Sequence, residues 1–241
     1  MRSGNPVLRN NTFTQAGAVP SGEVMTIQGT VNKTMILLLL LVFSASMVWK
    51  NPVPFMPFMW PSIIGGFICA MVTIFNKKWA AITAPLYAFI EGLFLGCFSA
   101  LMERQYPGIV IQAVGLTFGT LFCLLMAYTS RLIKPTENFK LGIVSATGGI
   151  ALFYFISIIV GFFGIQMPLI HSSGPFGIAF SFFVVTIAAL NLVLDFDFIE
   201  KGAESGAPRY MEWYGAFGLV VTLIWLYIEI LRLLSKLRSR N

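Results

Sequence analysis

Three acidic residues lie inside long apolar runs of this 241-residue chain: Glu91, Asp195 and Glu229. A charged group within a membrane-spanning segment is costly, so such residues are rare and usually face the protein interior or a water-filled path. A carboxyl group in that position can bind and release a proton, and its oxygens are of the kind that Ca²⁺ prefers as ligands. These three residues are therefore the candidate functional residues.

Asp195 lies on an apolar segment with Asn191 four residues earlier, so the two side chains share one face of a predicted helix and form a narrow polar stripe. Asp197 points to nearly the opposite side and aligns with Lys201, at the usual spacing of an exposed ion pair. We interpret Asp195 as the inward-facing acid, with Asn191 in support, and Asp197 as a residue at the membrane edge.

Glu229 and Glu91 have different surroundings in the sequence. Arg232 follows Glu229 by three residues, so Glu229 either forms a local ion pair or turns its carboxylate toward the core of a helix bundle. Glu91 lies near the middle of its apolar run without a basic residue within one turn. It must therefore be protonated, hydrated or paired with a group on another helix.

Two carboxylates that lie close together in a medium of low dielectric share a proton, and their titration belongs to the pair. The shared proton can hold two helices together through a hydrogen bond. Its loss leaves two negative charges that repel, which would open a path, and the freed oxygens suit Ca²⁺. A pair of buried acids thus predicts a pH-sensitive switch.

The composition places these acids in a membrane protein. The chain is 57% hydrophobic and 11% charged, with a mean hydropathy of +0.81, whereas soluble domains contain about 25% charged residues. Irregular backbone cannot face lipid, so each long apolar run must be a helix. The predicted spans are approximately residues 33–49, 59–75, 81–102, 108–130, 139–165, 175–199 and 213–234.

We therefore predict an all-α integral membrane protein with three segments. Residues 1–32 are a flexible polar arm, residues 33–237 are a seven-helix transmembrane domain, and residues 238–241 are a basic tail. The Lys and Arg residues lie at the ends of apolar runs, which argues against nucleic-acid binding. With one His and three isolated Cys residues a zinc site is not expected, and we expect no cofactor.

The distribution of basic residues predicts the orientation. The loops on the N-terminal side carry seven Lys or Arg residues and those on the opposite side carry two, so the N-terminus is expected in the cytoplasm. Seven complete spans would leave the basic C-terminal tail outside, against the same rule. Either the tail is an exception or the last span does not fully cross.

Four segments of the sequence resemble the bacterial branch of the transmembrane Bax inhibitor motif family, and the resemblance covers most of residues 1–237. The segments are residues 87–92 (YAFIEG), 106–110 (YPGIV), 194–200 (LDFDFIE) and 206–218 (GAPRYMEWYGAFG). The resemblance implies six helices around a central seventh, a bacterial inner (plasma) membrane location, and a pH-sensitive calcium leak controlled by an aspartyl pair on helices six and seven.

By position, Asp195 matches the family's first aspartate, and Glu229 falls where the family has its second. The resemblance therefore assigns Asp195 and Glu229 as pH sensor and gate. The family also has an arginine on helix two, whereas residues 59–75 here contain no Arg or Lys. Arg232 could replace that arginine, Glu91 could join the acids, and Asp195, Glu229 and Glu91 are expected to make transient Ca²⁺ contacts.

The leading functional prediction is a calcium leak channel in the lipid bilayer that responds to pH, with calcium ions and protons as its small partners and Ca²⁺ as permeant ion. A proton-coupled cation transporter is an alternative, because buried carboxylates also serve as proton relays. Another is a regulatory protein that binds and inhibits a membrane protease or a cell-death effector. An enzyme is not expected, since an intramembrane hydrolase would need facing acids with a catalytic water, or a Ser/His pair, and the sole His, His171, lies in a predicted loop.

Overall fold

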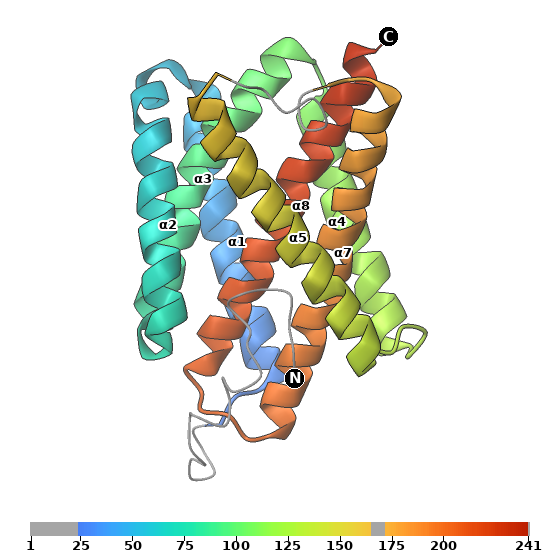
Figure 1. Ribbon diagram of the computed structural model, residues 1–241. Helices are drawn as coiled ribbons and strands as arrows, with labels where there is room; N and C mark the ends of the chain where they lie inside the picture. The colour runs from blue at the N-terminus through green and yellow to red at the C-terminus, as the bar shows by residue number, and fades with distance from the viewer. Residues whose placement is uncertain (1–23, 165–171, 241) are drawn as a thin grey trace. The chain divides into compact units, whose positions relative to one another are not determined.

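The computed structural model describes residues 24–164 and 172–240. Within these ranges the chain is helical and has no β-strand, and Val24 and Pro208 form one isolated antiparallel bridge. The helices are α1 (Ile27–Lys50), η2 (Val53–Phe58), α2 (Met59–Phe75), η3 (Lys77–Trp79), α3 (Ala80–Gln105), α4 (Ile109–Thr129), α5 (Glu137–Phe162), α7 (Pro175–Glu204) and α8 (Met211–Ser239), of which η2 and η3 are short 3-10 helices (Figure 1).

Seven helical stretches of the described residues are long and apolar enough to cross a membrane. The expected all-α seven-helix membrane fold is confirmed. Large apolar side chains on these helices are open to the surroundings, and Phe75, Ile82, Ile111 and Phe162 are 72–85% exposed. Such side chains are suited to lipid contact, because in a bilayer they lie in an apolar solvent.

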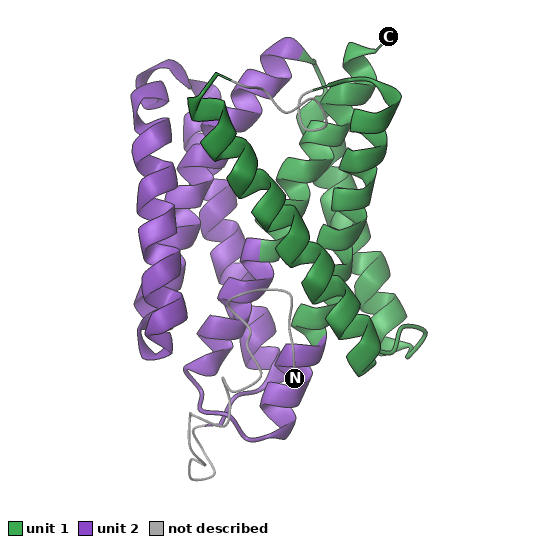
Figure 2. Cartoon of the chain, in the orientation of Figure 1, with its two compact units in different colours: residues 1–5, 106–196, 222–241 green, residues 6–105, 197–221 purple. Residues whose placement is uncertain are grey.

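The chain divides into two compact units, and each contains part of the last two helices (Figure 2). Among the described residues, unit 1 contains residues 106–196 and 222–240, and unit 2 contains residues 24–105 and 197–221. The expected placement of six helices around a central seventh stays a prediction.

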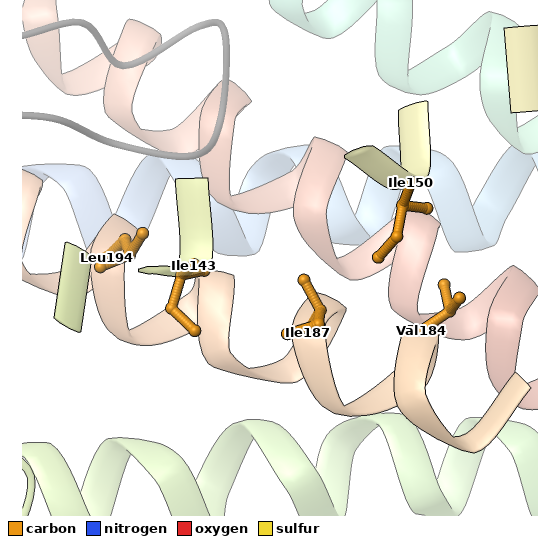
Figure 3. Close-up of a cluster of buried hydrophobic side chains, with 5 residues drawn as sticks. All are labelled: Ile143, Ile150, Val184, Ile187 and Leu194. Carbon is orange, nitrogen blue, oxygen red and sulfur yellow. The ribbon is translucent and has the colours of Figure 1, made fainter. Parts of the chain in front are cut away.

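In unit 1, helices α5 and α7 pack through branched aliphatic side chains. Ile143 and Ile150 of α5 lie against Val184, Ile187 and Leu194 of α7 (Figure 3). The residues on α7 recur at intervals of three and seven, so one face of that helix meets α5. This packing fixes the face of α7 that carries the candidate site.

In unit 2, helices α1 and α3 approach each other closely because α3 has glycines at the contact. A Cβ atom at Gly92 would overlap Ser44 and the carbonyl oxygen of Leu41. At Gly96 a Cβ would lie 2.7 Å from the carbonyl oxygen of Ala45. Glycines four residues apart thus leave room for the neighbouring backbone, as is common in membrane helices.

The predicted polar arm, residues 1–32, is wrong at its C-terminal boundary, because α1 begins at Ile27 rather than near Lys33. Thr26 caps the helix: its side chain accepts a hydrogen bond from the backbone N–H of Gly29. The helix start is also held by a distant residue, since Glu212 accepts hydrogen bonds from both the N–H and the hydroxyl of Thr26. Residues 1–23 lie outside the described part of the chain.

Helix α8 continues through Ser239 and so includes the first two residues of the predicted basic tail, residues 238–241. Arg238 donates to the carbonyl oxygen of Pro107 at 2.6 Å and to the side chain of Gln112 at 3.1 Å. The basic end of α8 is therefore docked within unit 1.

Candidate functional site

Two of the predicted acids, Asp195 and Glu229, are buried in unit 1. Asp195 lies on α7 and is 0% exposed, and Glu229 lies on α8 and is 1% exposed. A buried carboxylate needs partners that replace its lost hydration. The surroundings of Glu229 show how unit 1 meets that need for this residue.

The carboxylate of Glu229 is bound by a cation on its own helix. Arg232 Nη1 donates to the two carboxylate oxygens of Glu229 at 2.9 and 3.1 Å. The local ion pair is thus formed, and the carboxylate is turned inward as well, because the Glu229 side chain is 2% exposed and that of Arg232 is 32% exposed. The two interpretations of Glu229 that the sequence left open hold together.

A phenol from a second helix completes this group. The hydroxyl of Tyr154, on α5, donates toward both oxygens of Glu229 at 3.1 Å and accepts a hydrogen bond from Arg232 Nη1 at 2.7 Å. The guanidinium of Arg232 also lies over the Tyr154 ring, 5.1 Å from its centroid. The three side chains form a closed network that joins α5 to α8.

Sequence reasoning missed Tyr154. It is the single tyrosine of the Glu137–Phe162 span, and its neighbours Phe153 and Phe155 make it resemble one more apolar aromatic residue. A phenol within a membrane span needs a hydrogen-bond partner. That requirement is the signal that could have pointed to it.

Asn191 lies one turn before Asp195, as predicted, and joins α7 to α5. Its side-chain NH₂ donates to Thr147 Oγ1 on α5 at 2.8 Å and to the carbonyl oxygen of Ile187 at 2.8 Å. The side chain is 1% exposed. Asn191 therefore holds the part of α7 that carries Asp195 against α5.

The predicted pair of Asp197 with Lys201 is present in unit 2, where Lys201 Nζ lies 2.8 Å from Asp197 Oδ2. The pair is not exposed as its spacing suggested, because Asp197 is 7% exposed, and the position of Asp197 at the membrane edge stays a prediction. Every residue from 191 to 199 of α7 is buried. This part of the helix is enclosed on both faces, so pointing away from Asp195 does not bring Asp197 to the surface.

Glu91 lies on α3 in unit 2 and is half-buried. Its carboxyl group lies against the backbone of α2 at Gly66, where a Cβ atom would overlap it. Tyr87, one turn earlier, packs edge-on against Phe217 with ring centroids 5.0 Å apart. The side chain of Glu91 thus faces α2, and its predicted association with Asp195 and Glu229 stays a prediction.

Glu212, which lies in unit 2, is a second buried acid that sequence reasoning did not select. It is 2% exposed, accepts two hydrogen bonds from Thr26, and forms an ion pair with Lys33. Lys33 Nζ also lies 5.6 Å from the centroid of the Trp213 ring. An acidic residue in the first turn of α8 was a weak signal, since acids commonly occupy such positions for local reasons.

No group of three or more His, Cys, Asp or Glu side chains that could hold a metal ion occurs among residues 24–164 and 172–240. The transient Ca²⁺ contacts predicted for Asp195, Glu229 and Glu91 require no such resident site, so they stay predictions. His171 lies outside the described residues.

A family model described as Bax inhibitor 1 like matches residues 5–239 of the chain. The chain belongs to the Bax inhibitor 1 like family. The family predicted from the four sequence segments is thus confirmed, and assignment to its bacterial branch stays a prediction. A search of curated proteins found no match. Family membership and the seven apolar helices make the chain an integral membrane protein in contact with the lipid bilayer.

Proposed function

We propose that this member of the Bax inhibitor 1 like family is a pH-sensitive calcium leak channel, gated by Asp195 and Glu229. The observation that carries the proposal is the burial of both acids on membrane helices of the same unit. Acids in such positions commonly serve ion or proton pathways. The family match supports a membrane protein of channel-like or regulatory type.

In the proposed closed state, Asp195 and Glu229 share one proton and hold α7 against α8. Loss of that proton leaves two negative charges in a medium of low dielectric, where their repulsion is strong. The helices then separate and the freed oxygens offer hard ligands to a passing Ca²⁺ ion. A rise of pH on the side that reaches the pair therefore opens the path.

The neighbouring residues position the gate. Arg232 and Tyr154 hold the Glu229 carboxylate in one orientation, and Asn191 ties α7 to α5 beside Asp195. In this scheme Arg232 takes the place of the arginine that the resembling family has on helix two. Glu91 and Asp197 keep supporting roles, and no cofactor or enzymatic reaction is part of the mechanism.

Calcium flux into liposomes that contain the purified chain, measured across a range of pH, tests the proposal. The wild-type flux is expected to rise with pH by at most about tenfold per unit, because a single proton contributes about 1.4 kcal/mol per pH unit. Asp195→Asn should flatten this dependence, whereas Glu204→Gln, at an exposed acid in the last turn of the same helix, should preserve it. Flux that ignores pH in the wild type, or an unchanged profile in Asp195→Asn, would contradict the gate.

The description of the family as Bax inhibitor 1 like favours a second candidate, a regulatory protein that binds and inhibits a membrane protease or a cell-death effector. This candidate predicts no calcium flux from the reconstituted chain alone. A proton-coupled transporter is distinguished in the same liposomes, because an opposing proton gradient would then drive calcium against its own gradient. A channel would only let calcium run down its gradient.

We further propose that the protein resides in a bacterial inner membrane with its N-terminus in the cytoplasm. The distribution of Lys and Arg supports this orientation, with seven in the connections and adjoining helix ends on the N-terminal side and two in those on the opposite side. With that orientation, the C-terminal end of α7 faces the cytoplasm.

A further inference from the structure

Two buried polar atoms on α7 have no hydrogen-bond partner among the described residues: the hydroxyl oxygen of Ser181 and the amide oxygen of Asn191. Each residue is 1% exposed. A buried polar group without a partner loses its hydration and gains nothing in return, so native proteins rarely leave one. These two atoms, both in unit 1, therefore need an explanation.

Ser181 differs from the other buried hydroxyls of the described helices. Thr34, Thr73 and Thr117 each donate to the carbonyl oxygen four residues earlier. For Ser181 that carbonyl belongs to Gly177, and it accepts a hydrogen bond from Lys236 Nζ of α8 at 3.0 Å. The usual local partner of a helical serine is thus bound by another group.

The amide oxygen of Asn191 needs a hydrogen-bond donor. Its NH₂ group is bound to Thr147 and to the carbonyl of Ile187, so its free oxygen can only accept a hydrogen bond. Ser181 can donate and accept. A ligand that donates hydrogen bonds can serve both atoms, and water does so.

The two atoms lie on one face of α7 together with Ala188 and Asp195, which are both 0% exposed. At 3.6 residues per turn, the four positions fall within an arc of roughly 80° and extend over about 21 Å along the helix. Between the polar groups, Ala188 presents only a methyl group on this face. The cationic Lys236 next to the Ser181 end disfavours a metal cation there and tolerates water.

We propose that this face of α7 binds a file of water molecules that runs from Ser181 past Ala188 and Asn191 to Asp195. Buried water typically makes about three hydrogen bonds to polar groups that would otherwise have no partner. The water binding stands apart from the calcium leak. Only its role rests on the proposed function, in which the file brings protons to Asp195.

Thiol accessibility in liposomes tests the path. Cysteines are placed at Ser181 and at Ala188 of the full chain, in a background whose native Cys69, Cys97 and Cys123 are replaced by Ala. A small charged methanethiosulfonate reagent reacts with thiols that contact water. Val193→Cys is the matched control, because Val193 is also 0% exposed and lies on the opposite side of α7. Modification of Ser181→Cys and Ala188→Cys, but not of Val193→Cys, is expected.

Equal rates of thiol modification in the Ser181→Cys, Ala188→Cys and Val193→Cys variants would overturn the proposal. Because this assay does not measure ion flux, its outcome separates the two ideas. If the thiols at positions 181 and 188 are modified and calcium flux does not depend on pH, the water path is supported and the gate is contradicted. Flux that depends on pH without labelling would overturn the water path alone.

A second measurement needs only a conservative change. If Ser181 binds water, Ser181→Ala removes a partner of that water and lowers the Tm of the purified protein more than the control Ser62→Ala does. Ser62 is 6% exposed and donates to the carbonyl oxygen of Phe58 at 2.7 Å. If the Ser181 hydroxyl instead has no partner at all, its removal takes away a desolvated group and raises the Tm, and the proposal is then wrong.

Discussion

At the scale of single residues, two side chains hold the buried carboxylate of Glu229 in place. Arg232 supplies the positive charge and Tyr154 supplies a hydroxyl from α5. Removing one member of a buried pair leaves the other without compensation, which costs more than the pair itself contributes. The two partners of Glu229 therefore have different energetic roles, and mutation of the cation should be the more damaging change.

We predict that Arg232→Met lowers the free energy of unfolding in detergent by about 2–3 kcal/mol, less than for a fully enclosed pair, because the Arg232 side chain is 32% exposed. The double variant Glu229→Gln with Arg232→Met should recover part of this loss, since the uncompensated charge is then gone. Thermal and denaturant unfolding of both variants give the measurement.

The control is Arg104→Met. Arg104 is an exposed residue in the last turn of α3, and its replacement should stay within about 0.5 kcal/mol of the wild type. A double variant that is less stable than Arg232→Met alone would show that the ion pair does not account for the effect.

At the scale of elements, the acid on α3 is placed by a glycine on α2. The carboxyl group of Glu91 occupies the space that a side chain at Gly66 would need, whereas a Cβ at the neighbouring Gly65 would meet only Ile90 atoms at 3.6 Å. Two adjacent glycines of one helix thus differ in what surrounds them, and this difference makes them a matched pair for experiment.

Gly65→Ala is predicted to stabilise the protein by up to about 1 kcal/mol, the usual gain of alanine over glycine in a helix. Gly66→Ala should lose that gain, because its methyl group forces the Glu91 carboxyl group to move. If Glu91 takes part in ion flux, Gly66→Ala should also change the pH profile, and Gly65→Ala should not. Equal stability changes and equal flux profiles for the two variants would show that the Glu91 position does not depend on Gly66.

The start of α1 is the second element held by a long-range contact. The hydroxyl of Thr26 accepts a hydrogen bond from the N–H of Gly29, which caps the helix, and donates one to the distant Glu212. Loss of a helix cap costs about 1 kcal/mol. The added contact with a buried acid should raise that cost.

Accordingly, Thr26→Ala is expected to lower the free energy of unfolding by about 1–2 kcal/mol. Thr129→Ala serves as its control, because Thr129 is exposed and its hydroxyl donates only to the carbonyls of Leu125 and Met126 on the same helix. Equal effects of the two changes in denaturant unfolding would rule out a role for the contact with Glu212.

At the scale of the whole molecule, the orientation in the membrane follows from charge and length. Helix α8 contains 29 residues and is therefore about 43 Å long, which exceeds the roughly 30 Å of the hydrocarbon core. Its length and composition suit a complete crossing. A complete last span places the two ends of the seven-span chain on opposite sides of the bilayer.

We predict that Lys77→Cys reacts with a membrane-impermeant maleimide only from the cytoplasmic side, and that Ser239→Cys reacts only from the other side. The measurement is made in cells and in inverted vesicles, in the background without native cysteines. Lys78→Cys, in the same loop and exposed, repeats the first position. Labelling of Lys77→Cys from outside would show that the orientation is the opposite of the predicted one. Labelling of Lys77→Cys and Ser239→Cys from the same side would show that α8 does not cross the membrane.

The sequence alone determined the features that depend on composition and on local spacing. Apolar runs predicted seven membrane helices, and most helix ends lie within a few residues of the predicted ones. The spacings of three and four residues predicted the pairs Glu229 with Arg232 and Asp197 with Lys201. Both kinds of inference succeed because the residues concerned share one helix, whose geometry is known in advance.

Only the tertiary structure decided which distant residues complete each group. Tyr154 lies 75 residues from Glu229, and Thr26 lies 186 residues from Glu212. The contact of Glu91 with α2 at Gly66 likewise depends on how two helices pack. No periodicity in a single sequence contains the rotation and separation of packed helices, so the partners of the buried acids emerge only when the chain is folded.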